Sequence, residues 1–261
     1  MIEWSHLLVG GLGLFFVMTL LWACQLKTRN AGSVDVVWAL GTGIVGCWFV
    51  LQAEGLPLRR LLIGAVLLIW SFRLGWHIWR RLVADAEEDG RYAALREKWG
   101  DDANRNLFLF FQVQGLLALL FALPAGIAAS NDQAISLFDW LGLSVGLLAI
   151  VGETVADRQL AAFKRVASKS QVCDRGFWRY SRHPNYFFEW LHWWVYPLFA
   201  IGYSLGWVTL FAPVIMLLFL YRITGSPATE ARATLTRGGA YRRYQRETSA
   251  FFPWLPKVDK Q

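Results

Sequence analysis

Long apolar runs alternate with polar segments along most of the chain. Seven runs can be distinguished, at residues 7–26, 34–51, 61–79, 107–129, 135–152, 187–203 and 207–221. A membrane-spanning helix needs roughly 20 mainly apolar residues, and every run comes near that length, the last two being short. The pattern therefore predicts an all-α polytopic membrane protein with a bundle of seven transmembrane helices.

Positive charge is distributed unevenly between the connections. Residues 27–33, 80–106 and 157–185 and the tail from residue 222 hold 23 of the 26 lysines and arginines. The alternate connections hold almost none apart from Arg59 and Arg60. Because cytoplasmic loops are enriched in Lys and Arg, this asymmetry predicts an amino terminus outside and a carboxyl tail in the cytoplasm.

Composition narrows the class of protein. With 56% hydrophobic residues, 15 Trp and 18 Phe, the chain is too apolar for a soluble domain. The net charge is +7, and the basic residues lie between the apolar runs instead of forming a separate basic module. Anionic lipid or an anionic cofactor therefore explains them better than nucleic acid. The three cysteines form no CxxC pair, and we predict no metal site. The first run lacks a basic flank and a cleavage site, which favours a retained span.

The densest group of functional side chains lies where a basic loop turns into the sixth run. Pro184 can occupy the first position of a helix, so we expect a helix to begin there. At helical spacing, Asn185, Glu189, His192 and Tyr196 share one face. A carboxylate in an apolar helix indicates function, although Glu189 could instead pair with an arginine and hold the bundle together.

Further ionisable residues fall in or beside other runs. They are Asp35 with Trp38 in the second run, Arg73, His77 and Arg80 in the third, and Glu153, Asp157 and Lys164 at and beyond the end of the fifth. Together with the face that begins at Asn185, they indicate a polar cavity open to the cytosol. Taken singly, Arg73 and Arg80 are at least as well explained by lipid contact, His77 by core packing and Asp35 by a helix cap.

Two polar segments supply further candidates. Arg91 and Tyr92 suit a phosphate and a stacked base, whereas Asp85 and Glu87 are expected on a solvated helix face. In the tail, Ser226 before Pro227 predicts a helix start, with the candidates Glu230 and Arg232 shortly after it. A basic amphipathic segment at residues 241–247 could rest on lipid headgroups or close over the cavity.

Two motifs carry a resemblance to a known family. They are Arg182-His183-Pro184-Asn185-Tyr186-Phe187 followed by Glu189, and Tyr241-Arg242-Arg243-Tyr244-Gln245-Arg246-Glu247-Thr248-Ser249-Ala250-Phe251-Phe252-Pro253. Both resemble bacterial homologues of the steroid 5-alpha-reductase family, which is similar in fold to sterol reductases and isoprenylcysteine carboxyl methyltransferases. The resemblance covers most of the chain and is strongest after residue 150. It departs at Phe188, where the family usually has glycine.

The resemblance implies an NADPH-dependent oxidoreductase of the 3-oxo-5-alpha-steroid 4-dehydrogenase type. Such an enzyme saturates the carbon–carbon double bond of a lipophilic enone that enters from the bilayer, such as a 3-oxo-Δ4-steroid. A single integral-membrane reductase domain would cover residues 1–261, with residues 1–106 on the substrate side and residues 107–261 as the cofactor-binding half and tail. We expect it in the bacterial inner membrane, with the active-site cavity facing the cytoplasm.

The same resemblance assigns residues to the cofactor. Asn185 and Glu189 would contact the nicotinamide end, Asp157 and Lys164 the middle of NADPH, and Arg91, Arg179 and tail residues its phosphates. The full cofactor-binding set is Arg73, Arg91, Tyr92, Glu153, Asp157, Lys164, Arg179, Arg182, His183, Asn185, Tyr186, Glu189, Glu230, Arg232, Tyr241 and Tyr244.

Hydride addition to an enone builds negative charge on its carbonyl oxygen, so the site needs a donor there. Asp35 is the first candidate for this acid. Glu54 competes with it, because residues 52–57 loosely resemble the family's carbonyl-binding segment, although Glu54 falls on the outer side of the predicted topology. Trp38 and His77 complete the catalytic candidates.

Two other classes of function stay open. A membrane methyltransferase that uses S-adenosylmethionine would share the Arg-His-Pro-x-Tyr element and the basic tail, but nucleotide phosphates account better for the many arginines. A non-enzymatic channel, transporter or lipid-binding protein is the other alternative. Polar groups confined to the cytoplasmic half argue against a continuous pathway.

Overall fold

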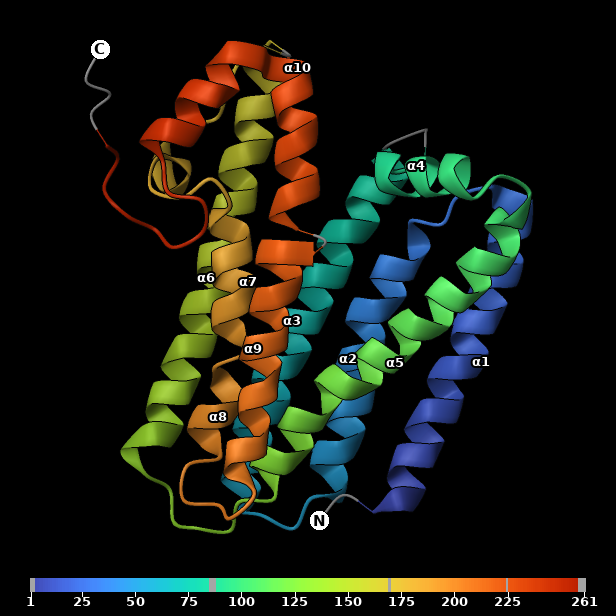
Figure 1. The fold of residues 1–261 in the computed structure, drawn as a ribbon. Helices are drawn as coiled ribbons and strands as arrows, with labels where there is room; N and C mark the ends of the chain where they lie inside the picture. The colour runs from blue at the N-terminus through green and yellow to red at the C-terminus, as the bar shows by residue number, and fades with distance from the viewer. Residues whose placement is uncertain (1–2, 85–87, 169, 224, 258–261) are drawn as a thin grey trace. The chain divides into compact units, whose positions relative to one another are not determined.

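A computed structural model describes residues 3–84, 88–168, 170–223 and 225–257 (Figure 1). Every regular element in this part of the chain is a helix. Asp85 and Glu87, expected on a solvated face, lie outside the described residues. The chain divides into two compact units, of which unit 1 comprises Met1–Asp139 and Phe199–Thr209 and unit 2 comprises Trp140–Leu198 and Leu210–Gln261.

Six helical stretches of the described residues are long and apolar enough to cross a membrane. They are α1 (Trp4–Thr28), α2 (Ser33–Gln52), α3 (Pro57–Ala84), the stretch Gly90–Ala129, α6 (Leu137–Val166) and the stretch Gly206–Ile223. The stretch Gly90–Ala129 contains α4 (Gly90–Trp99), the short 3₁₀ helix η1 (Gly100–Asp102) and α5 (Ala103–Ala129). The prediction of an all-α chain with several membrane-length helices is therefore confirmed.

The sixth predicted run, residues 187–203, does not form one continuous helix. It contains most of α7 (Pro184–His192) and all of α8 (Val195–Phe199), with turns at Trp193 and Trp194 between them. Pro197 explains the break, because a proline ring lacks an N–H and clashes with the carbonyl group four residues earlier, here that of Trp193.

In unit 1, α2 lies between its neighbours and contacts α1, α3 and α5 (Figure 1). Leu14, Phe49 and Ala118 belong to the buried cluster that joins α1, α2 and α5. Gly43 lets α2 approach α3 closely, since a Cβ at this position would lie 2.2 Å from the Ser71 hydroxyl oxygen. The packing of these helices thus depends on large apolar side chains on two faces of α2 and on a small residue on the third.

Unit 2 contains α6, α7, α9 (Phe211–Leu218), the π-helix η4 (Phe219–Ile223) and α10 (Ser226–Glu247). The predicted helix starts at Pro184 and Ser226 are both confirmed. Trp190 joins α7 to α9, because its Nε1 donates to the Pro213 carbonyl oxygen at 3.0 Å. Gly238 has a φ of 54° and kinks α10, which divides the tail helix into two arms (Figure 1).

Arg59 and Arg60, the exceptions to the charge asymmetry, both form hydrogen bonds within unit 1. Arg59 is only 1% exposed and donates to both carboxylate oxygens of Asp139, at 2.5 and 3.0 Å. Its Nη1 also donates to the backbone carbonyl oxygens of Asn131 and Gln133. Arg60 donates to carbonyl oxygens at the end of α2. The buried guanidinium of Arg59 is tolerated only with such complete pairing, and the contacts of Arg60 join α3 to the end of α2.

We predict that Arg59→Met strongly destabilises the protein, because it leaves the Asp139 carboxylate buried without its partner. Removal of one member of a buried pair costs about 3–5 kcal/mol, whereas Arg59→Met combined with Asp139→Leu should cost less. Unfolding free energies in mixed micelles would measure both effects. Lys98→Met, at an exposed site on α4, is the control. Equal stability of Arg59→Met and this control would contradict the prediction.

Candidate functional site

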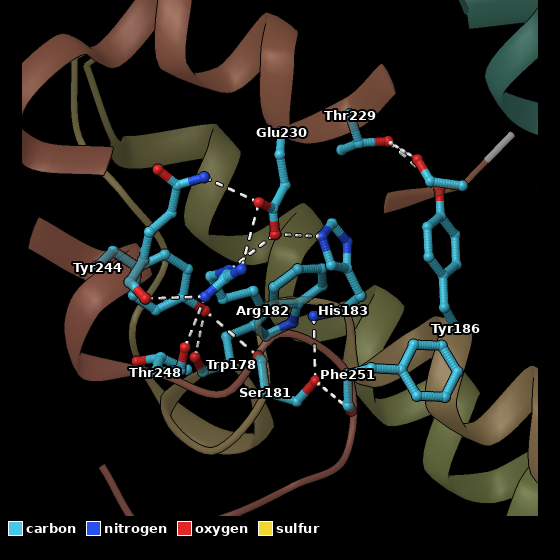
Figure 2. Close-up of polar contacts among 12 residues, drawn as sticks. Trp178, Ser181, Arg182, His183, Tyr186, Thr229, Glu230, Tyr244, Thr248 and Phe251 are labelled. Carbon is cyan, nitrogen blue, oxygen red and sulfur yellow. Dashed lines mark hydrogen bonds and ion pairs between the residues drawn. The ribbon is translucent and has the colours of Figure 1, made fainter. Parts of the chain in front are cut away.

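A group of polar contacts in unit 2 surrounds the Glu230 carboxylate (Figure 2). We call Arg182, His183, Glu230 and Gln245 the Glu230 network. Arg182 and His183 directly precede α7, whereas Glu230 and Gln245 lie on the two arms of α10. The network therefore fastens both arms of the tail helix to the start of α7.

Arg182 makes four side-chain hydrogen bonds to the protein. Its Nε and Nη2 donate to the two Glu230 carboxylate oxygens, at 2.7 and 3.2 Å. Its Nη1 donates to the carbonyl oxygens of Gln245 and Thr248, at 2.9 and 2.8 Å. The Arg182 backbone N–H also donates to the Ser249 carbonyl oxygen. Arg182 thus joins three separate segments of unit 2.

His183 contributes from the same loop. The ring is 3% exposed, and its Nε2 lies 3.0 Å from Glu230 Oε1. Because an ionised carboxylate only accepts hydrogen bonds, Nε2 carries the hydrogen in this contact. The imidazole stacks on the Tyr186 ring at 5.3 Å, and the Tyr186 hydroxyl lies 3.5 Å from that of Thr229. His183 is therefore held from two sides in one orientation.

Glu230 is the only carboxylate in this network. Its burial alone would raise the pKa of the carboxyl group, but hydrogen bonds from His183, Arg182 and Gln245 lower this pKa to about 2. Gln245 Nε2 donates to Oε2 at 2.8 Å. Glu230 consequently stays ionised, and its charge stabilises the contacts between α10 and the loop before α7.

Two tyrosines line the same tail helix. The Tyr244 hydroxyl donates to the Trp178 carbonyl oxygen and lies 3.3 Å from that of Ser181. Burial raises the pKa of Tyr241 to about 12, with a further contribution from the Glu230 charge, and burial also raises the pKa of Tyr244. Both side chains are therefore neutral at ordinary pH, and Tyr244 acts as a hydrogen-bond donor.

The facing sides of α6 and α7 carry the other polar candidates of unit 2. Asn185 Nδ2 donates to Asp157 Oδ1 at 3.3 Å. Glu153 and Glu189 are both buried, and Glu189 accepts a hydrogen bond from Trp193 Nε1 at 3.1 Å. The structure thus brings the predicted polar residues of these two helices to one side of each helix.

Phe188, the departure from the family pattern, has a matching residue on α6. A Cβ at position 152 would lie 2.3 Å from the Phe188 ring, which is 7% exposed. Gly152 therefore provides the space that the ring fills. The bulk at position 188 and the missing side chain at position 152 complement each other.

The break after α7 affects the predicted polar face of Asn185, Glu189, His192 and Tyr196 only beyond His192. Tyr196 belongs to α8, yet its hydroxyl still lies 3.0 Å from His192 Nε2. One continuous helix was therefore wrong beyond His192, but the prediction that His192 and Tyr196 share a side is confirmed by their contact. Lys164 does lie on a continuation of the fifth run, because α6 extends to Val166.

Several other candidates lie in unit 1. The Asp35 carboxylate accepts hydrogen bonds from the Tyr92 hydroxyl at 2.7 Å and from Arg91 Nη2 at 2.8 Å. Trp38, one turn along α2, makes edge contacts with the rings of Trp70 and Phe121. Two further candidates, Arg73 and His77, are half-buried on α3, and Glu54 is exposed between α2 and α3.

Three candidate cations of unit 2 have exposed side chains: Lys164, Arg179 and Arg232. Residues that the sequence did not single out also support the Glu230 network, notably Ser181, whose Oγ donates to the Phe251 carbonyl oxygen at 2.7 Å. Backbone acceptors of this kind leave no signal in a sequence. No group of three or more His, Cys, Asp or Glu within the described ranges could hold a metal ion.

We predict that Glu230 stabilises the protein above about pH 4.5 and that this contribution disappears towards pH 2. Its folded-state pKa of about 2 lies below the ordinary value of 4.5, so the unfolded chain binds the proton first as the pH falls. Melting temperatures of the protein and of Glu230→Gln, measured from pH 7 to pH 3, should therefore converge in acid. A gap between them that is independent of pH would contradict this assignment.

Comparison with known proteins gives a family but no activity. No solved structure matches the chain. An uncharacterised protein of Schizosaccharomyces pombe is 29% identical over 282 residues, which cover 95% of this chain and 80% of that protein. The model of a family described as "Protein of unknown function (DUF1295)" matches residues 21–248, which include the Glu230 network and all the candidates named above. The chain therefore belongs to the DUF1295 family.

Proposed function

We propose that the chain is an NADPH-dependent reductase that saturates the carbon–carbon double bond of a lipophilic enone, as in the steroid 5-alpha-reductase family. The observation that carries the proposal is the contact between Asn185 on α7 and Asp157 on α6, with the buried Glu189 one turn further along α7. An amide and a carboxylate side by side can accept from and donate to a carboxamide such as that of nicotinamide.

The exposed cations of unit 2 fit the rest of such a cofactor. Arginine forks and lysine side chains bind phosphate through charge-assisted hydrogen bonds, and Lys164, Arg179 and Arg232 are exposed. Arg182 has a different role in this proposal. Since it already donates four side-chain hydrogen bonds to the protein, we assign it to fastening the tail instead of binding phosphate.

NADPH, when bound, would supply the hydride for the β-carbon and become NADP⁺, and a proton at the α-carbon would complete the saturated ketone. The chain must then stabilise the negative charge that develops on the carbonyl oxygen. Asp35 and Glu54 are the candidates. We favour Asp35, because it is half-buried whereas Glu54 is exposed. Its carboxylate accepts from Tyr92 and Arg91 in the structure, so it would have to take up a proton before it could donate to the carbonyl oxygen.

We further infer an arrangement in the membrane. Seven segments would span the inner membrane of a bacterium with the amino terminus outside, and α7 and α8 together would form an interrupted sixth span. The uneven distribution of Lys and Arg supports this orientation, and the burial of Arg59 accounts for its main exception. NADPH would then arrive from the cytosol and the steroid-like substrate from the bilayer.

We predict that NADPH raises the melting temperature of the purified protein and that S-adenosylmethionine does not. A ligand at 100 times its Kd adds about 2.7 kcal/mol to stability. Glu189→Gln should abolish the shift, while Glu97→Gln, at an exposed site on α4, should retain it. A shift with S-adenosylmethionine alone would identify a methyltransferase. An unchanged NADPH shift in Glu189→Gln would refute the assignment of Glu189.

A second prediction concerns the donor at the carbonyl oxygen. With a 3-oxo-Δ4-steroid as substrate, Asp35→Asn should lower kcat by about 10²–10³-fold, the usual effect of removing such a donor. The NADPH-induced melting shift should persist in this variant, because the proposed nicotinamide contacts of Asn185, Asp157 and Glu189 lie on α6 and α7 and not beside Asp35. Glu54→Gln should have nearly normal turnover. The opposite pattern would move the donor to Glu54.

A further inference from the structure

A short segment after α10 displays apolar side chains in a fixed position. We call residues 251–257 the aromatic strap, which forms the last described part of the chain (Figure 1). The Trp254 N–H donates to the Tyr180 carbonyl oxygen at 2.9 Å, and the Lys257 N–H donates to that of Glu247 at 2.8 Å. The Phe251 carbonyl oxygen accepts from Ser181 Oγ. The strap is therefore tied to unit 2 along its length.

Only the first side chain of the strap is buried. Phe251 is 1% exposed and contacts the rings of Tyr221 and Trp190 (Figure 2 shows it beside Ser181). By contrast, Phe252 is 49% exposed, Trp254 73% and Leu255 74%. Three large apolar side chains thus face outward within four residues, on a backbone that prolines 253 and 256 restrict further. Such a patch indicates a partner.

The hydrogen bonds to Tyr180 and Ser181 show where the strap lies along α7. Tyr180 and Ser181 stand where the basic loop turns into α7, which is the polar-to-apolar boundary of this unit. The Phe252 ring lies 6.2 Å from that of Phe187 and 5.4 Å from that of Trp190, both in the first two turns of α7. The exposed strap therefore continues the aromatic surface of α7, the first part of the proposed sixth span, near the start of that helix.

The chemistry of this position selects the partner. Aromatic side chains, Trp above all, gather at the level of lipid headgroups because their rings are amphipathic. Lys257, at the end of the strap, is an exposed cation and suits anionic headgroups. We propose that Phe252, Trp254 and Leu255 insert into the headgroup–acyl boundary of the bilayer as an interfacial anchor. This anchor does not depend on the proposed reductase activity.

The anchor is also connected to the Glu230 network. Arg182 donates to the carbonyl oxygen of Thr248 through its side chain and to that of Ser249 through its backbone, just before the strap. Insertion of the strap thus limits how far this part of the tail can move away from α7. The bilayer becomes one of the supports of the polar group around Glu230.

The test uses a fluorescent label at single cysteines in the full-length chain, after Cys24, Cys47 and Cys173 have been replaced by alanine. Trp254→Cys and Leu255→Cys report on the strap. Leu235→Cys is the matched control, because Leu235 is an equally large apolar residue, 88% exposed on α10 of the same unit. The protein is placed in phosphatidylcholine–phosphatidylglycerol vesicles that contain either nitroxide-labelled lipid or aqueous iodide.

We expect both strap labels to lose most of their emission to a nitroxide near the headgroup and little to iodide, and the Leu235 label to do the reverse. Quenching of the strap by iodide as strongly as at Leu235 would place it in water and overturn the proposal. Quenching by neither agent would mean that protein covers the strap, which also overturns it. Equal lipid quenching at all three positions would refute a specific role for the strap.

Discussion

The bidentate ion pair between Arg182 and Glu230 is the interaction on which the polar part of unit 2 depends. A carboxylate with a pKa of about 2 must be ionised, and an ionised group that is only partly solvated needs several donors. Arg182, His183 and Gln245 provide them from the loop before α7 and from α10. Because the same guanidinium holds two backbone carbonyl groups of the tail, loss of this pair would release α10 and the strap together.

Unit 1 applies the same rule at both ends of α2. At the start of α2, Asp35 accepts from Tyr92 and Arg91, and beyond its other end Arg59 is enclosed by Asp139 and carbonyl oxygens. Twenty residues of helix separate these ends by about 30 Å, the thickness of the hydrocarbon core. Between them the side chains of α2 are almost all apolar. The charged groups thus lie near the two ends of α2, where other residues supply hydrogen-bond partners.

Much of the helical framework could be predicted from the sequence, because apolar length and proline position act locally. Pro184 and Ser226 mark helix starts that the structure confirms. The break at Trp193 and Trp194 was missed although Pro197 stands in the sequence, since a proline in an apolar run does not always break the helix. Pro124, for example, lies inside α5. The pairing of Arg182 with Glu230 was also beyond reach. These residues are 48 positions apart, and periodicity describes the faces of helices but not which faces meet.

The structure separates arginines that are hydrogen-bonded to the protein from arginines that are exposed, and this changes where a phosphate could bind. Sequence motifs treat Arg179 and Arg182 alike, as two arginines beside the same helix start. In the structure, Arg182 is committed to Glu230 and the tail, whereas Arg179 is exposed at the end of the 3₁₀ helix η2 (Gly176–Arg179). A phosphate that recruited Arg182 would have to replace four existing hydrogen bonds, but one at Arg179 would displace mainly water. In the proposed cofactor site, Arg182 would therefore hold the tail, and Arg179 would be the better phosphate ligand.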